Sequence, residues 1–367
     1  MNRSMTTIPR TMKAVLLKGH GGFEQLEYRD DVPVPLPKTG EVLIRVSAAG
    51  VNNTDINTRT AWYSKSVTEG TTPEGGAAGY AQATPGDTGW TGAALAFPRI
   101  QGADVCGRVV AAGDGVDPAR IGERVLIEPV LREPVGWEPS RACYFGSECD
   151  GGFAEYTKVA AIHAHKIESP LSDAELASFP CAYSAAENML TRADVGAGET
   201  VLVTGASGGV GSAAVQLAKR RGASVLAITS ASKADHVKTL GADRIIPRTA
   251  ELLDACGRET ADVVVDVVGG PQWPELLEVL RRGGRYAVAG AIAGPMVTLD
   301  LRTLYLKDLR LLGCTILEPG VFSNLVRYIE RHEIKPVLAK TYPLQEIVRA
   351  QREFLGKRLT GKLVLIP

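Results

Sequence analysis

The stretch that decides the fold is VLVTGASGGVGSAAVQLAKRRGA, residues 201–223. It opens with a short apolar run, passes through a turn with four glycines between Thr204 and Ser212, and continues with small and apolar residues at helical spacing. We therefore predict a buried strand that ends at Thr204, a glycine-rich turn, and a helix over residues 208–221. A strand, a tight turn and a helix in this order are typical of an α/β domain.

The turn itself has the chemistry of a phosphate site. Glycines let the backbone approach a pyrophosphate closely, and the unpaired N–H groups at a helix start stabilise its charge. The spacing Gly-x-x-Gly-x-x-Gly departs slightly from the strict dinucleotide fingerprint, but the strand–turn–helix context is the required one. The alternative is a tight turn without a ligand. The predicted cofactor contacts here are Gly205, Ser207, Gly208, Gly209, Val210 and Gly211, with Val268 and Gly290 at the ends of two later strands.

The end of the second strand predicts which nicotinamide cofactor is used. An NAD site usually carries an acid there to hold the ribose 2′-hydroxyl, but residues 227–233 read AITSASK and contain none. Hydroxyls and cations stand instead, and a 2′-phosphate needs both. The sequence therefore favours NADPH, although Lys233 alone could also just solvate a helix start. The residues predicted to bind the phosphate are Thr229, Ser230, Lys233 and Arg248.

Patterns on either side of this stretch indicate two kinds of architecture. After about residue 174, strands alternate with helices, which predicts a parallel sheet covered on both faces. The predicted strands are 201–203, 224–228, 244–246, 263–267, 285–290 and 309–314, and the helices are 208–221, 233–240 and 274–281. Before it, short alternating strands predict an antiparallel β domain, at 12–18, 41–49, 108–112, 123–130 and 153–160. The end of the chain predicts helices at 321–333 and 344–355 and a closing strand at 362–366.

One stretch, residues 62–96, has little periodicity and is rich in Gly, Ala, Thr and Pro. Ordinary connections have about 4–6 residues, so a segment this long is either functional or disordered. A lid, a subunit contact and simple disorder all remain open for it.

Composition excludes several classes of protein. The 367 residues are 45% hydrophobic and 22% charged, with zero formal net charge, so two domains are expected and neither nucleic acid nor an anionic membrane surface is indicated. No apolar run reaches the roughly 18 residues of a membrane span, and the first 13 residues lack a secretion signal. Six scattered cysteines form no disulfide framework. We expect a cytoplasmic protein that acts on a small molecule.

Beyond these patterns, the chain resembles the medium-chain dehydrogenase/reductase superfamily, in its zinc-independent, quinone oxidoreductase-like branch. The resemblance covers nearly the whole chain apart from residues 62–96. It depends on the glycine turn and on AGVNNTD (49–55), FPRIQGADVCGRV (97–109), GERV (122–125), GGFAEY (151–156) and TGKLVL (360–365).

The resemblance implies an α/β protein in which a GroES-like, β-rich catalytic domain adjoins a doubly wound Rossmann cofactor domain. The implied limits are 1–173 for the catalytic domain, 174–317 for the Rossmann domain, and 318–367 for a C-terminal segment that completes the catalytic domain. Two positions depart from the quinone reductases of the family, which often have tyrosine where this chain has Asn57 and threonine where it has Ala185.

Comparison with zinc-dependent relatives predicts no metal. Those relatives place a cysteine ligand at the position of Asn52 and a His–Glu pair at Ala103 and Asp104, which leaves only Cys181 as a matching ligand. One thiolate cannot hold a site that needs three protein ligands. The lobe that binds structural zinc in those relatives retains only Cys143 and Cys149 of four cysteines. His163 and His165 alternate on one predicted strand, where packing or exposure is the more ordinary explanation.

Without zinc, the acceptor itself must accommodate negative charge. A conjugated carbonyl, such as a quinone, an enone or an acryloyl thioester, delocalises that charge onto oxygen, where hydrogen-bond donors stabilise it. We predict Asn52, Asn57 and Tyr183 as catalytic residues, with Tyr183 alternatively a packing residue and Asp55 a structural one. An alcohol dehydrogenase or a non-catalytic NADPH-binding protein remain alternatives. The apolar run 309–316 predicts a sheet edge through which two copies form a homodimer, unless its own domain covers it.

Overall fold

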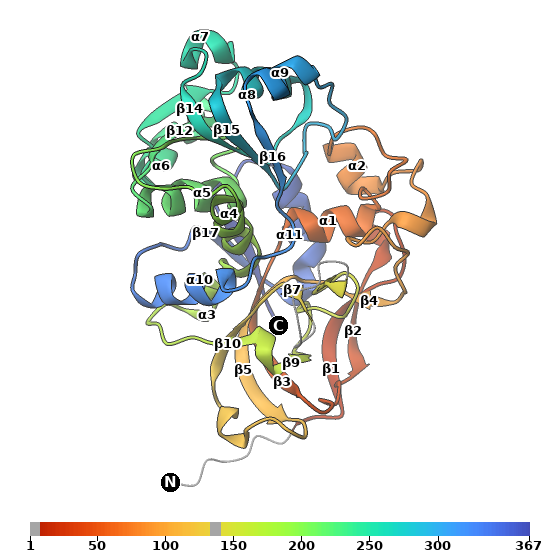
Figure 1. Ribbon diagram of the computed structural model, residues 1–367. Helices are drawn as coiled ribbons and strands as arrows, with labels where there is room; N and C mark the ends of the chain where they lie inside the picture. Colours follow the sequence, from red (N-terminus) through yellow and green to blue (C-terminus); the bar gives the residue numbers. More distant parts are fainter. Residues whose placement is uncertain (1–7, 133–140) are drawn as a thin grey trace.

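The computed structural model describes residues 8–132 and 141–367, which fold around two main sheets, one above the other in Figure 1. The upper sheet has six strands in the order β13-β12-β11-β14-β15-β16, and every neighbouring pair is parallel. Its strands are β11 (Thr200–Val203), β12 (Ser224–Thr229), β13 (Arg244–Pro247), β14 (Ala261–Asp266), β15 (Leu280–Val288) and β16 (Arg310–Gly313). This is the doubly wound arrangement, and it confirms the predicted Rossmann class.

Alternating side chains of the sheet enter two separate cores. Val201 and Val203 of β11 face one core, together with α4 (Pro180–Arg192) and α5 (Gly209–Arg220). Leu202, between them, faces the opposite core with α8 (Trp273–Val279). A strand that is buried on both faces reads as a continuous apolar run, which is why residues 201–203 carry no polar side chain. Each fully buried side chain of this size contributes about 1.5–3 kcal/mol.

The strand order changes side between β11 and β14, which is the topological switch point of the sheet. Strands β12 and β13 follow β11 on one side, and β14, β15 and β16 continue on the other. In open parallel sheets, ligands bind outside the carboxyl ends of the strands at such a point. The loop after β11 is the glycine-rich turn, so the strongest motif of the sequence lies at this position.

The lower sheet contains β3, and the end of the chain returns to it. It has seven strands, and β18 (Lys362–Ile366) pairs antiparallel with β3 (Glu41–Gly50), which also pairs with β5 (Asp104–Ala112). A separate three-stranded sheet has the order β2 (Leu26–Pro33), β1 (Thr11–Leu17), β4 (Arg99–Ile100). The GroES-like β-rich class is therefore confirmed, while the residue limits proposed for the domains remain a prediction.

The remaining strands are β6 (Arg124–Ile127), β7 (Val130–Leu131), β8 (Cys143–Tyr144), β9 (Tyr156–Ala160), β10 (Ala164–Lys166) and β17 (Leu338–Pro343). The remaining helices are α1 (Asn53–Thr60), α2 (Pro73–Ala78), α3 (Asp173–Leu176), α6 (Ala234–Thr239), α7 (Leu252–Cys256), α9 (Leu301–Leu306), α10 (Val321–Glu330) and α11 (Ile347–Leu355). No helix in the described part of the chain is long and apolar enough to span a membrane.

The structure contains elements that the patterns did not predict. Helix α4 is the longest of them, and it was missed because most of its surface is buried, which removes the polar face that marks a helix in sequence. Strands β2 and β17 were missed because much of their surface is exposed and carries charged residues. The segment 62–96 contains α2 and a short 3₁₀ turn at Pro85–Asp87, and it makes hydrogen bonds to both halves of the molecule.

Candidate active site

The glycine-rich turn leaves no room for side chains at its centre. Gly205 has a φ of +56°, in the left-handed region, and a Cβ at Gly211 would lie 2.2 Å from the carbonyl oxygen of Gly205. Helix α5 begins at Gly209, with Gly208 as an N-cap that has no side chain. The first N–H groups of a helix have no partner within it. The turn is thus a compact, glycine-lined cradle at the positive end of a helix, in the predicted strand–turn–helix context.

Behind this turn, the buried carboxylate of Asp266 holds the neighbouring loop in place. It accepts hydrogen bonds from Thr204 Oγ1 at 2.5 Å, from the backbone N–H of Val268 at 2.8 Å, and from the hydroxyl of Tyr286. Val268 packs beside Gly205, because a Cβ on Gly205 would lie 3.2 Å from Val268 Cγ2. Sequence analysis missed Asp266, because a carboxylate at a strand end does not reveal that its partners are backbone amides.

The four residues predicted to bind a 2′-phosphate are brought together at the end of β12. The backbone N–H of Arg248 donates to Thr229 O at 2.9 Å, and Arg248 lies close enough to Lys233 to lower the pKa of its ammonium, after the larger effect of burial. Within the part of the chain that the structure describes, the buried Thr229 hydroxyl oxygen has no hydrogen-bond partner. A buried polar atom without a partner costs roughly 1–3 kcal/mol, so Thr229 is suited to a ligand that would complete it.

A second lysine, Lys357, joins this group from the loop before β18. The Lys233 ammonium donates to the carbonyl oxygens of Lys357 and Leu359, at 2.8 and 3.1 Å, and the Lys357 ammonium donates to Asn53 Oδ1 at 3.0 Å. Burial and the charge of Lys233 lower the pKa of Lys357 to about 8. Two partly desolvated cations whose hydrogen bonds go to neutral oxygens indicate a site for an anion. Sequence analysis missed Lys357 because 124 residues separate it from Lys233.

These features fit a nicotinamide dinucleotide. The glycine cradle suits the pyrophosphate, and the Thr229 end suits the ribose of the adenosine half. Gly290, at the end of β15, lines a cavity at the same edge of the sheet, and a Cβ on it would lie 3.0 Å from the Val267 carbonyl oxygen.

On the other side of this edge, Asn52 belongs to a buried polar cluster with Asp104 and Lys362. The Asn52 amide donates to Asp104 Oδ2 at 2.9 Å, and its oxygen accepts from the Lys362 ammonium. Lys362 also forms an ion pair with Asp104 at 2.7 Å, with both side chains buried. Lys362 reaches toward the glycine turn, because a Cβ on Gly209 would lie 3.7 Å from Lys362 Cδ. Asn52 is therefore committed to this cluster, and its amide is less available to an acceptor than we predicted.

The positions that correspond to zinc ligands do not fit a zinc ion. Asp104 accepts from the backbone N–H of Cys181 at 2.6 Å through one oxygen and from Lys362 through the other. Burial and then the charge of Asp104 raise the pKa of the Cys181 thiol to about 12, and its Sγ lies 3.0 Å from the Tyr144 hydroxyl. Cys181 and Asp104 are two groups, and Asp104 is already paired with an ammonium, whereas a zinc site needs at least three protein ligands. Within residues 8–132 and 141–367, no group of three or more His, Cys, Asp or Glu side chains is placed to hold a metal ion.

Helix α1 positions a second set of polar groups beside this cluster. The Tyr63 hydroxyl donates to Thr54 Oγ1 at 3.0 Å and is also hydrogen-bonded to the Asn57 side chain. Burial is the main cause that raises the pKa of Tyr63 to about 12, so it is a protonated donor at neutral pH. Asn57 thus lies in the predicted region, and its partner Tyr63 was missed because it sits at the start of the aperiodic segment.

Asp55 has the structural role that the sequence suggested. Its carboxylate accepts from the Asn52 backbone N–H at 2.7 Å, at the start of α1. Burial raises the pKa of Asp55 to about 7. The hydrogen bond fixes the first turn of α1 and thereby the positions of Asn52 and Asn57.

Tyr183 lies in a different environment from the other two predicted catalytic residues. Its hydroxyl donates to Lys335 O at 2.6 Å and accepts from the Gln216 amide at 2.9 Å. Its ring packs on Phe179, with 4.6 Å between the ring centroids. These contacts favour the packing role over proton donation, because the buried hydroxyl already donates to Lys335 O and accepts from Gln216 of α5.

The two histidines are explained by a buried carboxylate. His163 Nδ1 and His165 Nε2 lie 3.1 and 3.3 Å from Glu128, and the Arg132 guanidinium lies 2.5 Å from it. Hydrogen bonds from these groups hold the pKa of Glu128 at about 2, against the opposing effect of burial. The histidines are thus hydrogen-bonded to a buried structural carboxylate, which differs from the simple packing or exposure that we expected. They also do not share one strand, because His163 ends the 3₁₀ turn Ala161–His163 and His165 lies in β10.

Comparison with known proteins agrees with this geometry. Residues 38–169 match the family of alcohol dehydrogenase GroES-like domains, and residues 209–331 match the family of zinc-binding dehydrogenases. The chain is 30% identical to the acryloyl-coenzyme A reductase of Metallosphaera sedula, over 96% of this chain and 99% of the relative. It is 27% identical to the quinone oxidoreductase of Homo sapiens, over 99% of this chain and all of the relative. A crystal structure of a putative alcohol dehydrogenase from Sinorhizobium meliloti 1021 is 47% identical, with a TM-score of 0.89, and the match covers 100% of this chain and 99% of that one.

The fold and the site together define an oxidoreductase that uses a nicotinamide dinucleotide and acts on a small molecule. The chain belongs to the medium-chain dehydrogenase/reductase superfamily, in its quinone oxidoreductase-like branch.

Proposed function

We propose that this protein is an NADPH-dependent reductase of conjugated carbonyl compounds that works without zinc. The observation that carries the proposal is the ion pair between Asp104 and Lys362, at the position where zinc-dependent relatives bind their metal. A site without a Lewis acid suits an acceptor that delocalises its own developing charge. The relatives named as an acryloyl-coenzyme A reductase and a quinone oxidoreductase support the same class of acceptor.

The preference for NADPH is supported by charge at the end of β12. Lys233, Arg248 and Lys357 converge there, and hydroxyls of Thr229 and Ser230 stand where an NAD site carries a carboxylate. A 2′-phosphate would neutralise two close ammonium groups and complete the unpartnered Thr229 oxygen. NADH, which lacks that phosphate, would leave the same cations uncompensated.

Bound NADPH supplies a hydride, which adds two electrons and one hydrogen to the β-carbon of the acceptor. The protein must then stabilise the resulting negative charge on oxygen and allow one proton to arrive. Among the predicted catalytic residues we assign this role to Asn57, because its carbonyl oxygen accepts from the backbone N–H of Trp62, which lines the cavity at this edge of the sheet. Tyr63 and Thr54 join Asn57 as a pair of linked hydroxyls. The Thr54 hydroxyl donates its proton to the acceptor oxygen, the Tyr63 hydroxyl, which donates to Thr54, replaces that proton, and solvent returns a proton to Tyr63. Asn52 and Tyr183 act indirectly, by holding Lys362 and α4.

The test is NADPH consumption with a quinone, an enone, acryloyl-coenzyme A and an aldehyde as acceptors, with NADH in parallel. We expect turnover with at least one conjugated acceptor and a kcat/KM at least tenfold higher with NADPH. An alcohol dehydrogenase would instead oxidise alcohols and gain activity with added zinc. Binding of NADPH without reduction of any acceptor would favour a non-catalytic role.

We also propose that two copies pair through β16, which is an edge strand of the six-stranded sheet. Exposed apolar side chains lie on this strand and on the nearby α9, at Leu301, Tyr305, Leu306 and Leu311. An unpaired edge with apolar neighbours is suited to pairing with a second copy of itself. Light scattering should give the mass of a dimer for the wild type and of a monomer for Leu311→Asp.

A further inference from the structure

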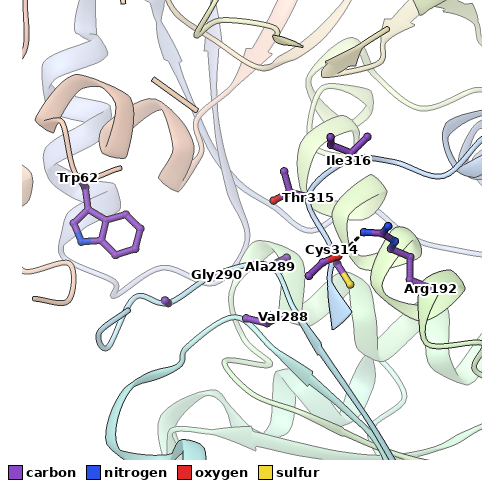
Figure 2. Close-up of a pocket in the computed structure, with 10 residues that line it drawn as sticks. Trp62, Arg192, Val288, Ala289, Gly290, Cys314, Thr315 and Ile316 are labelled. Atoms are coloured by element: carbon purple, nitrogen blue, oxygen red, sulfur yellow. Dashed lines mark hydrogen bonds between the residues drawn. The ribbon is translucent and has the colours of Figure 1, made fainter. Parts of the chain in front are cut away.

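A cavity of about 440 Å³ lies at the carboxyl ends of β15 and β16, and Trp62 stands across it (Figure 2). Its other walls include Gly290, Cys314 and Ile316. This is the edge of the sheet where the cofactor cradle also opens, and the volume is within the range of small-molecule sites. The cavity is therefore in the right place and of the right size for an acceptor.

The chemistry of this cavity is mainly apolar. Arg192 is the one charged residue among the described residues that line the cavity, and its guanidinium already has partners within the protein. The Arg192 guanidinium lies 3.0 Å from Glu318 and donates a hydrogen bond to Gly313 O, which Figure 2 shows as a dashed line. A phosphate-bearing acceptor would find no unpaired cation among these walls, whereas an uncharged one needs none.

The C-terminal end of helix α1 positions the Trp62 side chain at the cavity. The helix ends at Thr60, and Ala61 adopts the left-handed conformation with a φ of 61°, so the chain turns sharply there. The Trp62 backbone N–H donates to Asn57 O at 2.9 Å, and the indole N–H donates to Glu69 O at 3.1 Å. Since the only polar atom of the ring is satisfied by the protein, its carbon face is available to an apolar ligand.

The segment that carries Trp62 is also hydrogen-bonded to the loop after β15, through Thr71. Thr71 donates to Ile292 O through its backbone N–H at 2.9 Å and through its hydroxyl at 3.2 Å. The backbones approach so closely that a Cβ on Gly70 would lie 2.7 Å from the same carbonyl oxygen. Trp62 thus lies between two points at which its segment is hydrogen-bonded, at α1 and at the loop after β15, and it is the residue that segment 62–96 contributes to the described lining of the cavity.

We infer that Trp62 is a specificity-determining residue, and that it selects uncharged acceptors with a flat apolar body next to the conjugated carbonyl, such as a bicyclic quinone. This inference rests on the proposed function and narrows its acceptor class. Stacking of a flat ring on the indole face contributes about 0.5–1.5 kcal/mol, which is roughly a three- to tenfold gain in kcat/KM over an acceptor too small to stack.

The experiment compares kcat/KM for a bicyclic naphthoquinone, acrolein and acryloyl-coenzyme A, with saturating NADPH. We expect the wild type to prefer the naphthoquinone over both other probes. Trp62→Ala should lower the ratio of naphthoquinone to acrolein kcat/KM about three- to tenfold, and Trp62→Phe, which keeps an aromatic face, should lower it less. Gly70→Ala should lower the same ratio by displacing the wall.

Gly86→Ala is the matched control inside the same segment, because a Cβ there has nothing within 4 Å. It should leave the ratio unchanged. A wild type that prefers acryloyl-coenzyme A, or a ratio that stays within twofold in both Trp62 variants, would overturn the inference while leaving the proposed reductase function intact. If the wild type reduces none of the three probes, the proposed function itself fails.

Discussion

The cofactor end and the acceptor end of this site are built in different ways. The glycine cradle comes from one continuous stretch, and its shape follows from residues that have no side chain. The acceptor end combines side chains from distant parts of the chain, because Asn52 and Lys362 are 310 residues apart. A site formed by the backbone of one continuous stretch can therefore be predicted from sequence. A site formed by side chains from several strands cannot, because its composition depends on which strands the fold brings together.

The largest effect should come from breaking the ion pair that joins the two ends. Lys362→Met leaves Asp104 buried without its ammonium, so we expect a loss of about 3–5 kcal/mol in the free energy of unfolding. Denaturant titration measures this. Asp104→Asn combined with Lys362→Met removes both charges and should recover much of the loss. A single variant as stable as the wild type would show that the pair is not the structural link we describe.

Cofactor binding is disrupted most directly by a substitution at Gly211. A Cβ there would lie 2.2 Å from the Gly205 carbonyl oxygen, so Gly211→Ala must distort the cradle. We expect the Kd for NADPH to rise about a hundredfold, which corresponds to about 2.7 kcal/mol. Fluorescence titration checks this, with Gly196→Ala as control, since a Cβ there meets nothing within 4 Å. Equal affinity in both variants would contradict the predicted pyrophosphate site.

At the acceptor end, Tyr63→Phe removes one of the two linked hydroxyls. Thr54 and solvent can still supply a proton, so we expect kcat to fall only about tenfold, less than the roughly 10²–10⁴-fold that general acid–base catalysis typically contributes, while the Kd for NADPH stays within twofold. Steady-state kinetics and cofactor titration separate these quantities. Unchanged kcat would exclude Tyr63 from proton delivery.

The smallest effect concerns the pH dependence of the cofactor end. Lys357 has a lowered pKa of about 8, so it is protonated below this pH and loses its charge as the pH rises through it. An anionic cofactor prefers the ammonium, and the affinity for NADPH should therefore fall by about three- to fivefold between pH 7 and pH 9. Titrations across this range test it, and Lys357→Met should flatten the curve. A wild-type affinity that does not change with pH would remove Lys357 from the anion site.

Local patterns predicted much of this protein. Residues 201–223 indicated the cradle, the alternation of strands and helices after residue 174 indicated the parallel sheet, and residues 227–233 with Arg248 indicated the cationic end of β12. They did so because apolar runs, glycine spacing and missing carboxylates act over a few neighbouring residues. The tertiary structure decided what Asn52, Tyr183 and the segment 62–96 do. It engaged the first with Asp104 and Lys362, packed the second against α5, and brought Trp62 to the cavity. Whether a polar side chain can contact a substrate depends on hydrogen-bond partners that lie far away in the sequence. Local sequence patterns do not identify these partners.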